Sequence, residues 1–129
     1  MTKQFAQIIK DVDDYAIKLR ELIPEALGGF GTLSRAAQGR GTLDRKMKEL
    51  IALAIAVSGR CDACIAYHAR GALRAGVSRQ ELGEALAVAI QMGGGPAVNS
   101  AADALRAFDE FEVHNIAGEA GRVRALEPV

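Results

Sequence analysis

The residues of this chain best suited to chemistry are its two cysteines, which stand three positions apart in the segment Cys61-Asp62-Ala63-Cys64. Two cysteines placed at random in a chain of 129 residues would have this spacing in about one or two cases in a hundred. A Cys-x-x-Cys pair either cycles between dithiol and disulfide or supplies two ligands to a metal. The spacing therefore predicts redox chemistry or metal binding.

The surroundings predicted for this pair favour a reactive sulfur. Ser58-Gly59 is predicted to end one helix and Cys61 to begin the next, which puts Cys64 in the first turn. Free N–H groups and the positive end of the helix dipole stabilise a thiolate there, and Arg60 adds a cation. His68 follows Cys64 by one helical turn, where its imidazole can accept the thiol proton.

Glu49 is the fourth candidate, because the short turn after its predicted helix can fold it back against His68. A carboxylate in that place would orient the imidazole and hold its proton, as the third member of a catalytic triad does. The apolar neighbours Leu50, Ile51 and Leu53 indicate that Glu49 is partly buried. A buried carboxylate needs a partner.

Other interpretations of these residues stay open. Free cysteines act as small apolar residues in many cores. A structural zinc site would use the two cysteines and His68, with Glu49 or His114 as the fourth ligand, although no second Cys-x-x-Cys is present. Haem attachment is excluded, because it needs a histidine directly after the second cysteine and Ile65 stands there. Tyr67 is interpreted as a packing residue and His114 as a surface histidine.

The hydrophobic periodicity is helical throughout, and β-branched residues never cluster in alternating runs. We expect helices over about residues 2–22, 42–58, 61–74, 78–92 and 96–111, with a glycine-rich loop and a short helical turn at 28–41. The segment from Ala117 is expected to fray. These elements predict an all-α, single-domain helical bundle of about six helices covering residues 1–129.

Local signals mark several predicted helix ends. Thr42 can cap the helix that carries Glu49, and Gly76 has the residue type that follows a helix end. Ser78 with Glu81 forms a capping-box pattern, and Pro96 fits the first position of a helix.

Two predicted helical segments, 49–57 and 85–92, are apolar on more than one face. Such surfaces are buried either against another subunit or at the centre of a monomer. Burial of these surfaces against another subunit predicts a homo-oligomer.

Composition excludes several functions. The sixteen basic and sixteen acidic residues cancel and tryptophan is absent, so nothing attracts nucleic acid or an anionic membrane. The longest uncharged apolar run, Leu50–Val57, is far short of the roughly 20 residues that cross a bilayer. The charged segment Met1–Asp14 lacks the pattern of a signal peptide. We therefore expect a cytoplasmic protein, where paired cysteines are rarely structural. Gly93–Gly95 before Pro96 is interpreted as a break between helices rather than a phosphate site.

Two parts of the chain resemble the alkylhydroperoxidase D and carboxymuconolactone decarboxylase superfamily. The first is Lys48-Glu49-Leu50-Ile51-Ala52-Leu53-Ala54 followed by Cys61-x-x-Cys64-x-x-x-His68. The second is Ala75-Gly76-Val77-Ser78 with Glu81, followed by Met92-Gly93-Gly94-Gly95-Pro96. The resemblance covers about residues 43–111. It implies an all-helical bundle that assembles into trimers or hexamers.

The resemblance also implies roles. Cys64 matches the family's peroxide-attacking cysteine, Cys61 its resolving cysteine, His68 the general base and Glu49 the start of a proton relay. The implied activity is that of a thiol-dependent peroxidase or disulfide reductase, which takes a hydroperoxide or disulfide as substrate and an external dithiol as reductant, with no cofactor or metal. Ala63 stands where alkylhydroperoxidase D has a second histidine, so dithiol–disulfide cycling carries over more directly than strong peroxidase activity.

Two alternatives to this activity remain at the level of sequence. One is a decarboxylase or isomerase of a small acid that uses His68 and Glu49 for proton transfer, although the true decarboxylases of the superfamily lack the cysteine pair. The other is a non-enzymatic redox sensor whose disulfide changes assembly or partner binding.

Overall fold

The structure, a computed structural model, describes the backbone of residues 2–126 and the side chains of residues 2–115. Within that range it has no strand and consists of the helices α1 (Phe5–Leu22), α2 (Pro24–Gln38), α3 (Arg45–Gly59), α4 (Asp62–Arg74), α5 (Arg79–Gly93) and α6 (Gly95–Leu126). The all-α fold class predicted from the sequence is confirmed.

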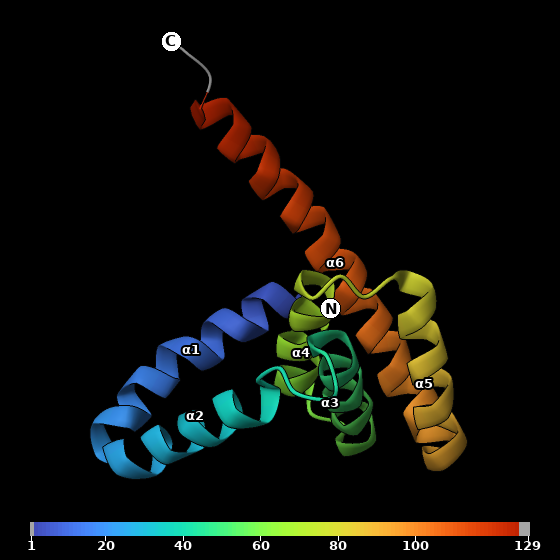
Figure 1. Cartoon of the computed structure of the whole chain (residues 1–129), viewed down its shortest axis with the longest axis horizontal. Coiled ribbons are helices and arrows are strands. Elements are labelled where there is room, and N and C mark those ends of the chain that lie inside the picture. The colour runs from blue at the N-terminus through green and yellow to red at the C-terminus, as the bar shows by residue number, and fades with distance from the viewer. Residues whose placement is uncertain (1, 127–129) are drawn as a thin grey trace.

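Helix α4 lies at the centre of the bundle, where it packs against α1, α3 and α6. Helix α5 packs against α3 and α6, so the last four helices form one group. Figure 1 shows α1 and α2 as a hairpin that extends away from this group. The C-terminal part of α6 extends beyond α3, α4 and α5 in another direction. The predicted site therefore lies where α3 and α4 pack against each other in this group.

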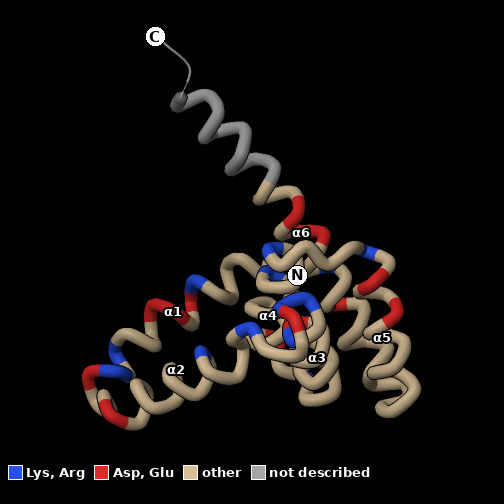
Figure 2. The backbone as a smooth tube through the Cα atoms, viewed as in Figure 1, with Lys and Arg blue, Asp and Glu red and all other residues tan. Residues whose placement is uncertain are grey.

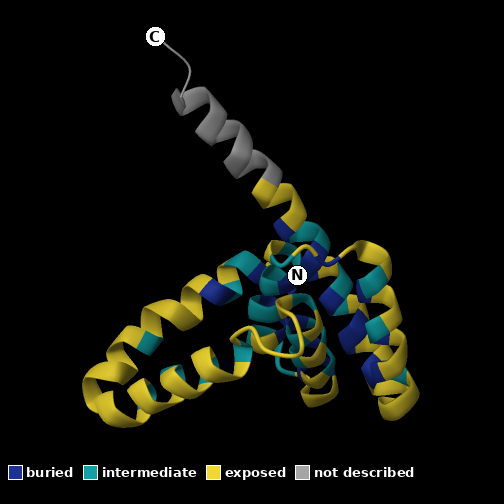
Figure 3. Cartoon of the chain, viewed as in Figure 1, coloured by how far each residue is buried: buried dark blue, intermediate teal, exposed yellow. Residues whose placement is uncertain are grey.

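The hydrophobic core lies mainly between α3, α4, α5 and α6, and Figure 3 shows that most of the α1–α2 hairpin is exposed. Small residues on α4 and α6 let these two helices approach closely. The buried alanines of the two helices are Ala66, Ala69, Ala72, Ala97, Ala101, Ala104 and Ala107. Larger side chains fill the remaining space, and those that are fully enclosed are Phe5, Leu53, Val57, Ile65 and Leu82.

Several helix ends follow the local signals. The Ser78 side chain accepts from the N–H of Glu81 while the Glu81 carboxylate accepts from the N–H of Ser78, which completes the predicted capping box. Gly76, just after α4, has a φ of 88° that favours glycine. Helix α5 ends at Gly93 and α6 begins at Gly95, so the predicted break between helices is confirmed.

The prediction of a loop at residues 28–41 is wrong. Pro24, which ends α1, is also the first residue of α2, a helix of 15 residues. Gly28 and Gly29 lie inside this helix, because glycine weakens a helix relative to alanine without breaking it. The Lys48 ammonium on α3 donates to the carbonyl of Gly39 just after α2, so the end of α2 gains a partner from the next helix.

Two other boundaries differ from the predictions. The cap of α3 is Asp44, whose side chain accepts from the N–H of Met47 at 2.9 Å, and not Thr42. The sequence predicts a helix end near Phe111 and fraying from Ala117, but the helical backbone of α6 continues to Leu126. The polar segment after Phe111 has no proline before the end of α6, and glycine alone does not stop a helix.

No helix in the described part of the chain offers a stretch long and apolar enough to cross a bilayer. Acidic and basic residues are interspersed along the described backbone, as Figure 2 shows.

Candidate functional site: a cysteine pair beside a histidine–glutamate pair

Cys61 and Cys64 are joined by a disulfide at the start of α4, with their Cα atoms 5.2 Å apart. Helix α4 begins at Asp62, one residue later than predicted, and Cys61 is its N-cap. The Cys61 sulfur accepts a hydrogen bond from the N–H of Cys64 at 3.2 Å, so it satisfies one of the free N–H groups of the first turn. Cys64 is exposed and Cys61 is half-buried. The more exposed residue of the pair is therefore the one to which the resemblance assigns attack.

The turn between α3 and α4 fixes where the cysteine pair begins. Arg60, directly after α3, has a left-handed backbone with φ 52° and ψ 40°, and its N–H donates to carbonyls of the last turn. The N–H of Cys61 donates to the carbonyl of Ala56 at 3.2 Å. These bonds satisfy the end of α3 and reverse the chain within two residues, so α4 folds back along α3.

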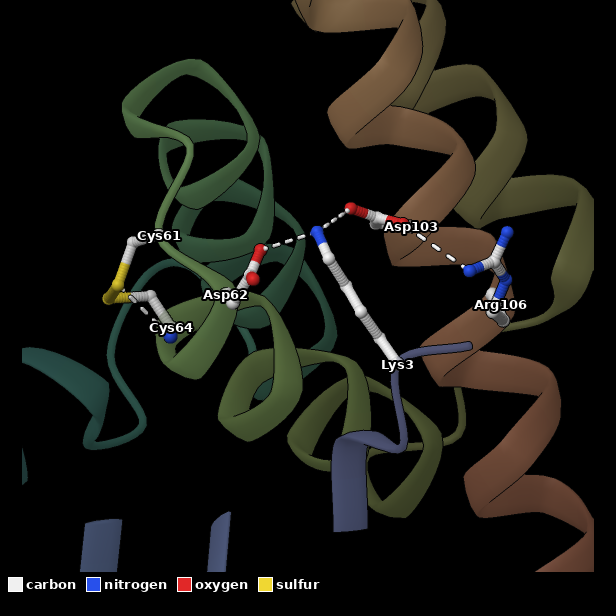
Figure 4. Close-up of polar contacts among 6 residues, drawn as sticks. All are labelled: Lys3, Cys61, Asp62, Cys64, Asp103 and Arg106. Atoms are coloured by element: carbon white, nitrogen blue, oxygen red, sulfur yellow. Dashed lines mark hydrogen bonds and ion pairs between the residues drawn. A yellow bond between two sulfur atoms is a disulfide. The ribbon is translucent and has the colours of Figure 1, made fainter. Parts of the chain in front are cut away.

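Asp62, between the two cysteines, is paired with Lys3 from the segment before α1. The Lys3 ammonium lies 3.2 Å from the Asp62 carboxylate and 2.8 Å from that of Asp103 on α6, and these two hydrogen bonds raise the pKa of Lys3. In Figure 4 the Asp62 carboxylate points toward Lys3, while the two cysteine side chains point away from it. Lys3 thus offsets the negative charge of Asp62, which stands between the two cysteines in the sequence. Sequence reasoning missed this residue, because its partners lie 59 and 100 positions away.

Glu49 and His68 form the second pair of the candidate site. Nδ1 of His68 lies 2.9 Å from Oε2 of Glu49, so α3 and α4 bring together the two residues that the sequence analysis placed side by side. The Glu49 side chain is 8% exposed and the His68 side chain 32% exposed. When Glu49 is an ionised carboxylate it only accepts hydrogen bonds, and Nδ1 of His68 is then the donor of this bond. That tautomer leaves Nε2 unprotonated, which is the arrangement a general base needs.

The two pairs share helix α4. His68 comes one turn after Cys64, so both side chains leave the helix on the same side. The contacts found within the described residues are the disulfide between Cys61 and Cys64 and the hydrogen bond between Glu49 and His68. His68 and the two sulfurs are thus related through their spacing on α4. The roles assigned to these four residues remain predictions.

Tyr67 is more than the packing residue expected from the sequence. Its hydroxyl donates to the Asp13 carboxylate, and so ties α1 to α4 beside the candidate site. Burial, together with this hydrogen bond and the charge of Asp13, raises the pKa of Tyr67 to about 12. The phenol therefore remains a neutral donor at physiological pH. No local pattern predicts a pair separated by 54 positions.

His114 lies apart from the cysteines, exposed on α6, where its ring makes an edge contact with Phe111. Among the described residues, no group of three or more His, Cys, Asp or Glu side chains is arranged to hold a metal ion. The two sulfurs that a zinc site would use are bonded to each other.

The bundle and its paired cysteines define an all-helical protein in which one helix, α4, carries both a disulfide and the histidine of a histidine–carboxylate pair. A sequence profile of the carboxymuconolactone decarboxylase family matches residues 24–107, from the first residue of α2 well into α6. This range is well over half of the chain, and the chain belongs to that family.

Related sequences agree with this assignment. The uncharacterized protein H16_B0147 of Cupriavidus necator is 38% identical over 109 residues, which cover 84% of this chain and 96% of the relative. The uncharacterized protein 4 in the cox locus of Paracoccus denitrificans is 39% identical over 83 residues, which cover 64% of this chain and 75% of the relative.

Solved structures have the same fold. The crystal structure of apo-lpg0406 from Legionella pneumophila, a carboxymuconolactone decarboxylase family protein, is 44% identical with a TM-score of 0.82, over 85% of this chain and 98% of that one. The family protein TM1620 of Thermotoga maritima is 29% identical with a TM-score of 0.73, over 84% and 96% of the two chains. That protein is described as a candidate participant in an antioxidative response.

Proposed function

We propose that this protein is a thiol-dependent peroxidase that cycles Cys61 and Cys64 between dithiol and disulfide, with His68 as general base and Glu49 as its partner. The carrying observation is the bonded sulfur pair at the start of α4 with its outer member, Cys64, exposed. A sulfur pair too far apart to bond, or wholly enclosed, would not support this chemistry. The antioxidative description of the Thermotoga maritima relative points in the same direction.

The reaction has three steps. His68 takes the thiol proton of Cys64, and the thiolate attacks the terminal oxygen of a hydroperoxide. The O–O bond breaks, Cys64 becomes a sulfenic acid, and the leaving alkoxide takes that proton back from His68 to become an alcohol. The Cys61 thiol then attacks the Cys64 sulfenic acid, which forms the disulfide and releases water. An external dithiol, of a protein or lipoyl type, reduces the disulfide by exchange and becomes a disulfide itself. These steps need no cofactor or metal.

Helix α4 supports the first step through its N-terminus. The N–H groups of the first turn and the positive end of the dipole stabilise a thiolate at Cys64. Glu49 holds the proton of Nδ1 on His68, so Nε2 is free to exchange a proton with the sulfur or the leaving oxygen.

We also propose that the protein acts in the cytoplasm as a homotrimer or homohexamer. Helix α2 buries none of its residues, and its Phe30 and Leu33 side chains are exposed. A second apolar surface, between α3 and α5, exposes Ile51 and Val88. Surfaces of this kind mark association with another chain. Light scattering after gel filtration tests this, and a mass of one chain would contradict it.

The test of the proposed activity is peroxide consumption coupled to a dithiol reductant, measured for wild type, Cys64→Ser and Cys61→Ser. Cys64→Ser is expected to abolish turnover. Cys61→Ser is expected to stop cycling after one oxidation, because no second thiol remains in the chain. Full activity in Cys64→Ser would contradict the assignment. Activity on a small ring-opened acid that survives loss of both cysteines would instead favour a decarboxylase or isomerase.

A further inference from the structure

Gly71 lies on α4 three residues after His68, on the same side of the helix. A Cβ atom placed on it would stand 2.6 Å from Oε2 of Glu49 and 2.7 Å from both Oε1 and Cδ. Real Cβ atoms essentially never come closer than 3.0 Å to another heavy atom. The three nearly equal distances put this position over the flat face of the carboxylate, so Glu49 lies directly against the Gly71 backbone.

The backbone of α4 gives no other reason for a glycine here. Gly71 is not among the glycines with positive φ, which are Gly76 and Gly94 in the described chain. Inside a helix, alanine is the more stabilising residue. Helix α4 uses alanine at its buried packing positions, among them Ala69 and Ala72. Glycine thus stands at the position where the Glu49 carboxylate meets the helix.

We infer that Gly71 is a positioning residue of this site: its missing side chain leaves the space that the Glu49 carboxylate needs to reach His68. A methyl group at position 71 would have to move the nearest carboxylate oxygen from 2.6 Å to at least the 3.4 Å where ordinary contact begins, a shift of about 0.8 Å. The carboxylate ends a flexible side chain, so it can move while the helices stay in place. That movement breaks the 2.9 Å bond that fixes the proton on Nδ1. This inference rests on the proposed function for its catalytic meaning.

Two readouts in a Cys61→Ser background test the inference. This background leaves Cys64 as the only thiol, and serine is a good helix cap at position 61. The first readout is the ¹⁵N spectrum of the imidazoles, in which His114 is the internal reference because the chain has two histidines. The second is the rate of Cys64 alkylation by iodoacetamide as a function of pH. If Gly71 had only a structural role, a variant at this position that still folds would leave both readouts unchanged.

The comparison is between Gly71→Ala and Gly83→Ala. Gly83 is an exposed helical glycine on α5 with nothing within 4 Å of an added Cβ, so its replacement is the matched control. In Gly71→Ala we expect His68 to lose the Nδ1–H signature and alkylation at pH 7 to slow about tenfold, because proton transfer by a positioned base is impaired. Gly83→Ala should behave as the background. A folded Gly71→Ala with unchanged spectrum and alkylation would overturn the inference.

A double variant keeps the test decisive if Gly71→Ala does not fold. Glu49→Ala removes the carboxylate that the new methyl group would strike, so Glu49→Ala/Gly71→Ala should fold and match Glu49→Ala in alkylation rate. If the double variant also failed to fold, the contact with Glu49 would not explain Gly71. Neither readout involves a peroxide, so failure of the proposed peroxidase activity would be seen separately, in turnover of the wild type.

Discussion

Glutamine in place of Glu49 keeps a hydrogen-bond acceptor against His68 and removes only the negative charge. The Glu49 side chain is 8% exposed and lies 2.9 Å from Nδ1 of His68. Water therefore compensates little for the loss of the charged interaction with His68. A hydrogen bond to a charged group contributes about 1.5–3 kcal/mol and one between neutral groups about 0.5–1.5 kcal/mol. The imidazole gains a proton when His68 deprotonates Cys64, before attack on the hydroperoxide. The difference of about 1–1.5 kcal/mol corresponds to about a tenfold change in the population of that thiolate form, and hence in the rate of oxidation.

Alanine at position 49 removes the whole bond and frees the imidazole to adopt its other tautomer. The loss of about 1.5–3 kcal/mol corresponds to roughly 10- to 100-fold in rate. The assay is stopped-flow oxidation of the reduced protein by a hydroperoxide at pH 7, with free thiols counted after quenching. We expect wild type to be fastest, Glu49→Gln intermediate and Glu49→Ala slowest.

The matched control for charge removal is Glu84→Gln, an exposed position on α5 that should leave the rate unchanged. Thermal unfolding of each variant separates effects on the site from loss of the fold. Equal rates for wild type and Glu49→Ala would refute the view that Glu49 acts through His68. Equal rates for the glutamine and alanine variants would refute the separate role of the retained acceptor.

Two further predictions concern the docking of α1. The pKa of Tyr67 is raised to about 12, above the value of about 10 for a free phenol, so its stabilisation is fully present below about pH 10 and is lost as pH rises toward 12. The measurement is urea unfolding at pH 9, 11 and 12, in which Tyr67→Phe should lose less stability with rising pH than wild type. The control is Tyr15→Phe, whose residue is 70% exposed and which should follow wild type. Parallel curves for Tyr67→Phe and wild type would contradict the stabilising role of the Tyr67 hydroxyl. The Glu110 carboxylate accepts from the N–H groups of Phe5 at 2.9 Å and Ala6 at 3.0 Å, so Glu110→Ala should lower the free energy of unfolding by about 2 kcal/mol and Tm by about 5–10 °C. The control is Glu112→Ala at an exposed position, which should change the free energy of unfolding by less than about 0.5 kcal/mol. An equal effect of both variants in calorimetry would show that the hydrogen bonds from Glu110 to the start of α1 do not stabilise the fold.

Features with a local cause could be predicted from the sequence. The capping box at Ser78 and the glycine after α4 depend on residues within a few positions, as does the helical spacing between Cys64 and His68. The disulfide spacing is local too. The contact between Glu49 and His68 could also be predicted, because the turn that joins their helices is only two residues long.

Features with a distant cause could not be predicted. Helix α2 contains three glycines and resembles a loop in sequence, and the hydrogen bond at its end comes from Lys48 on the next helix, α3. The partners of Lys3 and Tyr67 lie in other helices and leave no local pattern. Gly71 gives no signal by itself either, because only the packing of α3 on α4 places a carboxylate against it.

The central claim is that Cys64 reacts first and Cys61 closes a disulfide onto it. Intact mass spectrometry tests it most directly, on reduced wild type and reduced Cys61→Ser, each before and after one equivalent of hydroperoxide. The account predicts a loss of about two daltons in wild type, as two thiol hydrogens leave, and a gain of about 16 daltons on Cys64 in the variant, as a sulfenic acid forms. An unchanged mass in both proteins, or the same loss in both, would contradict it.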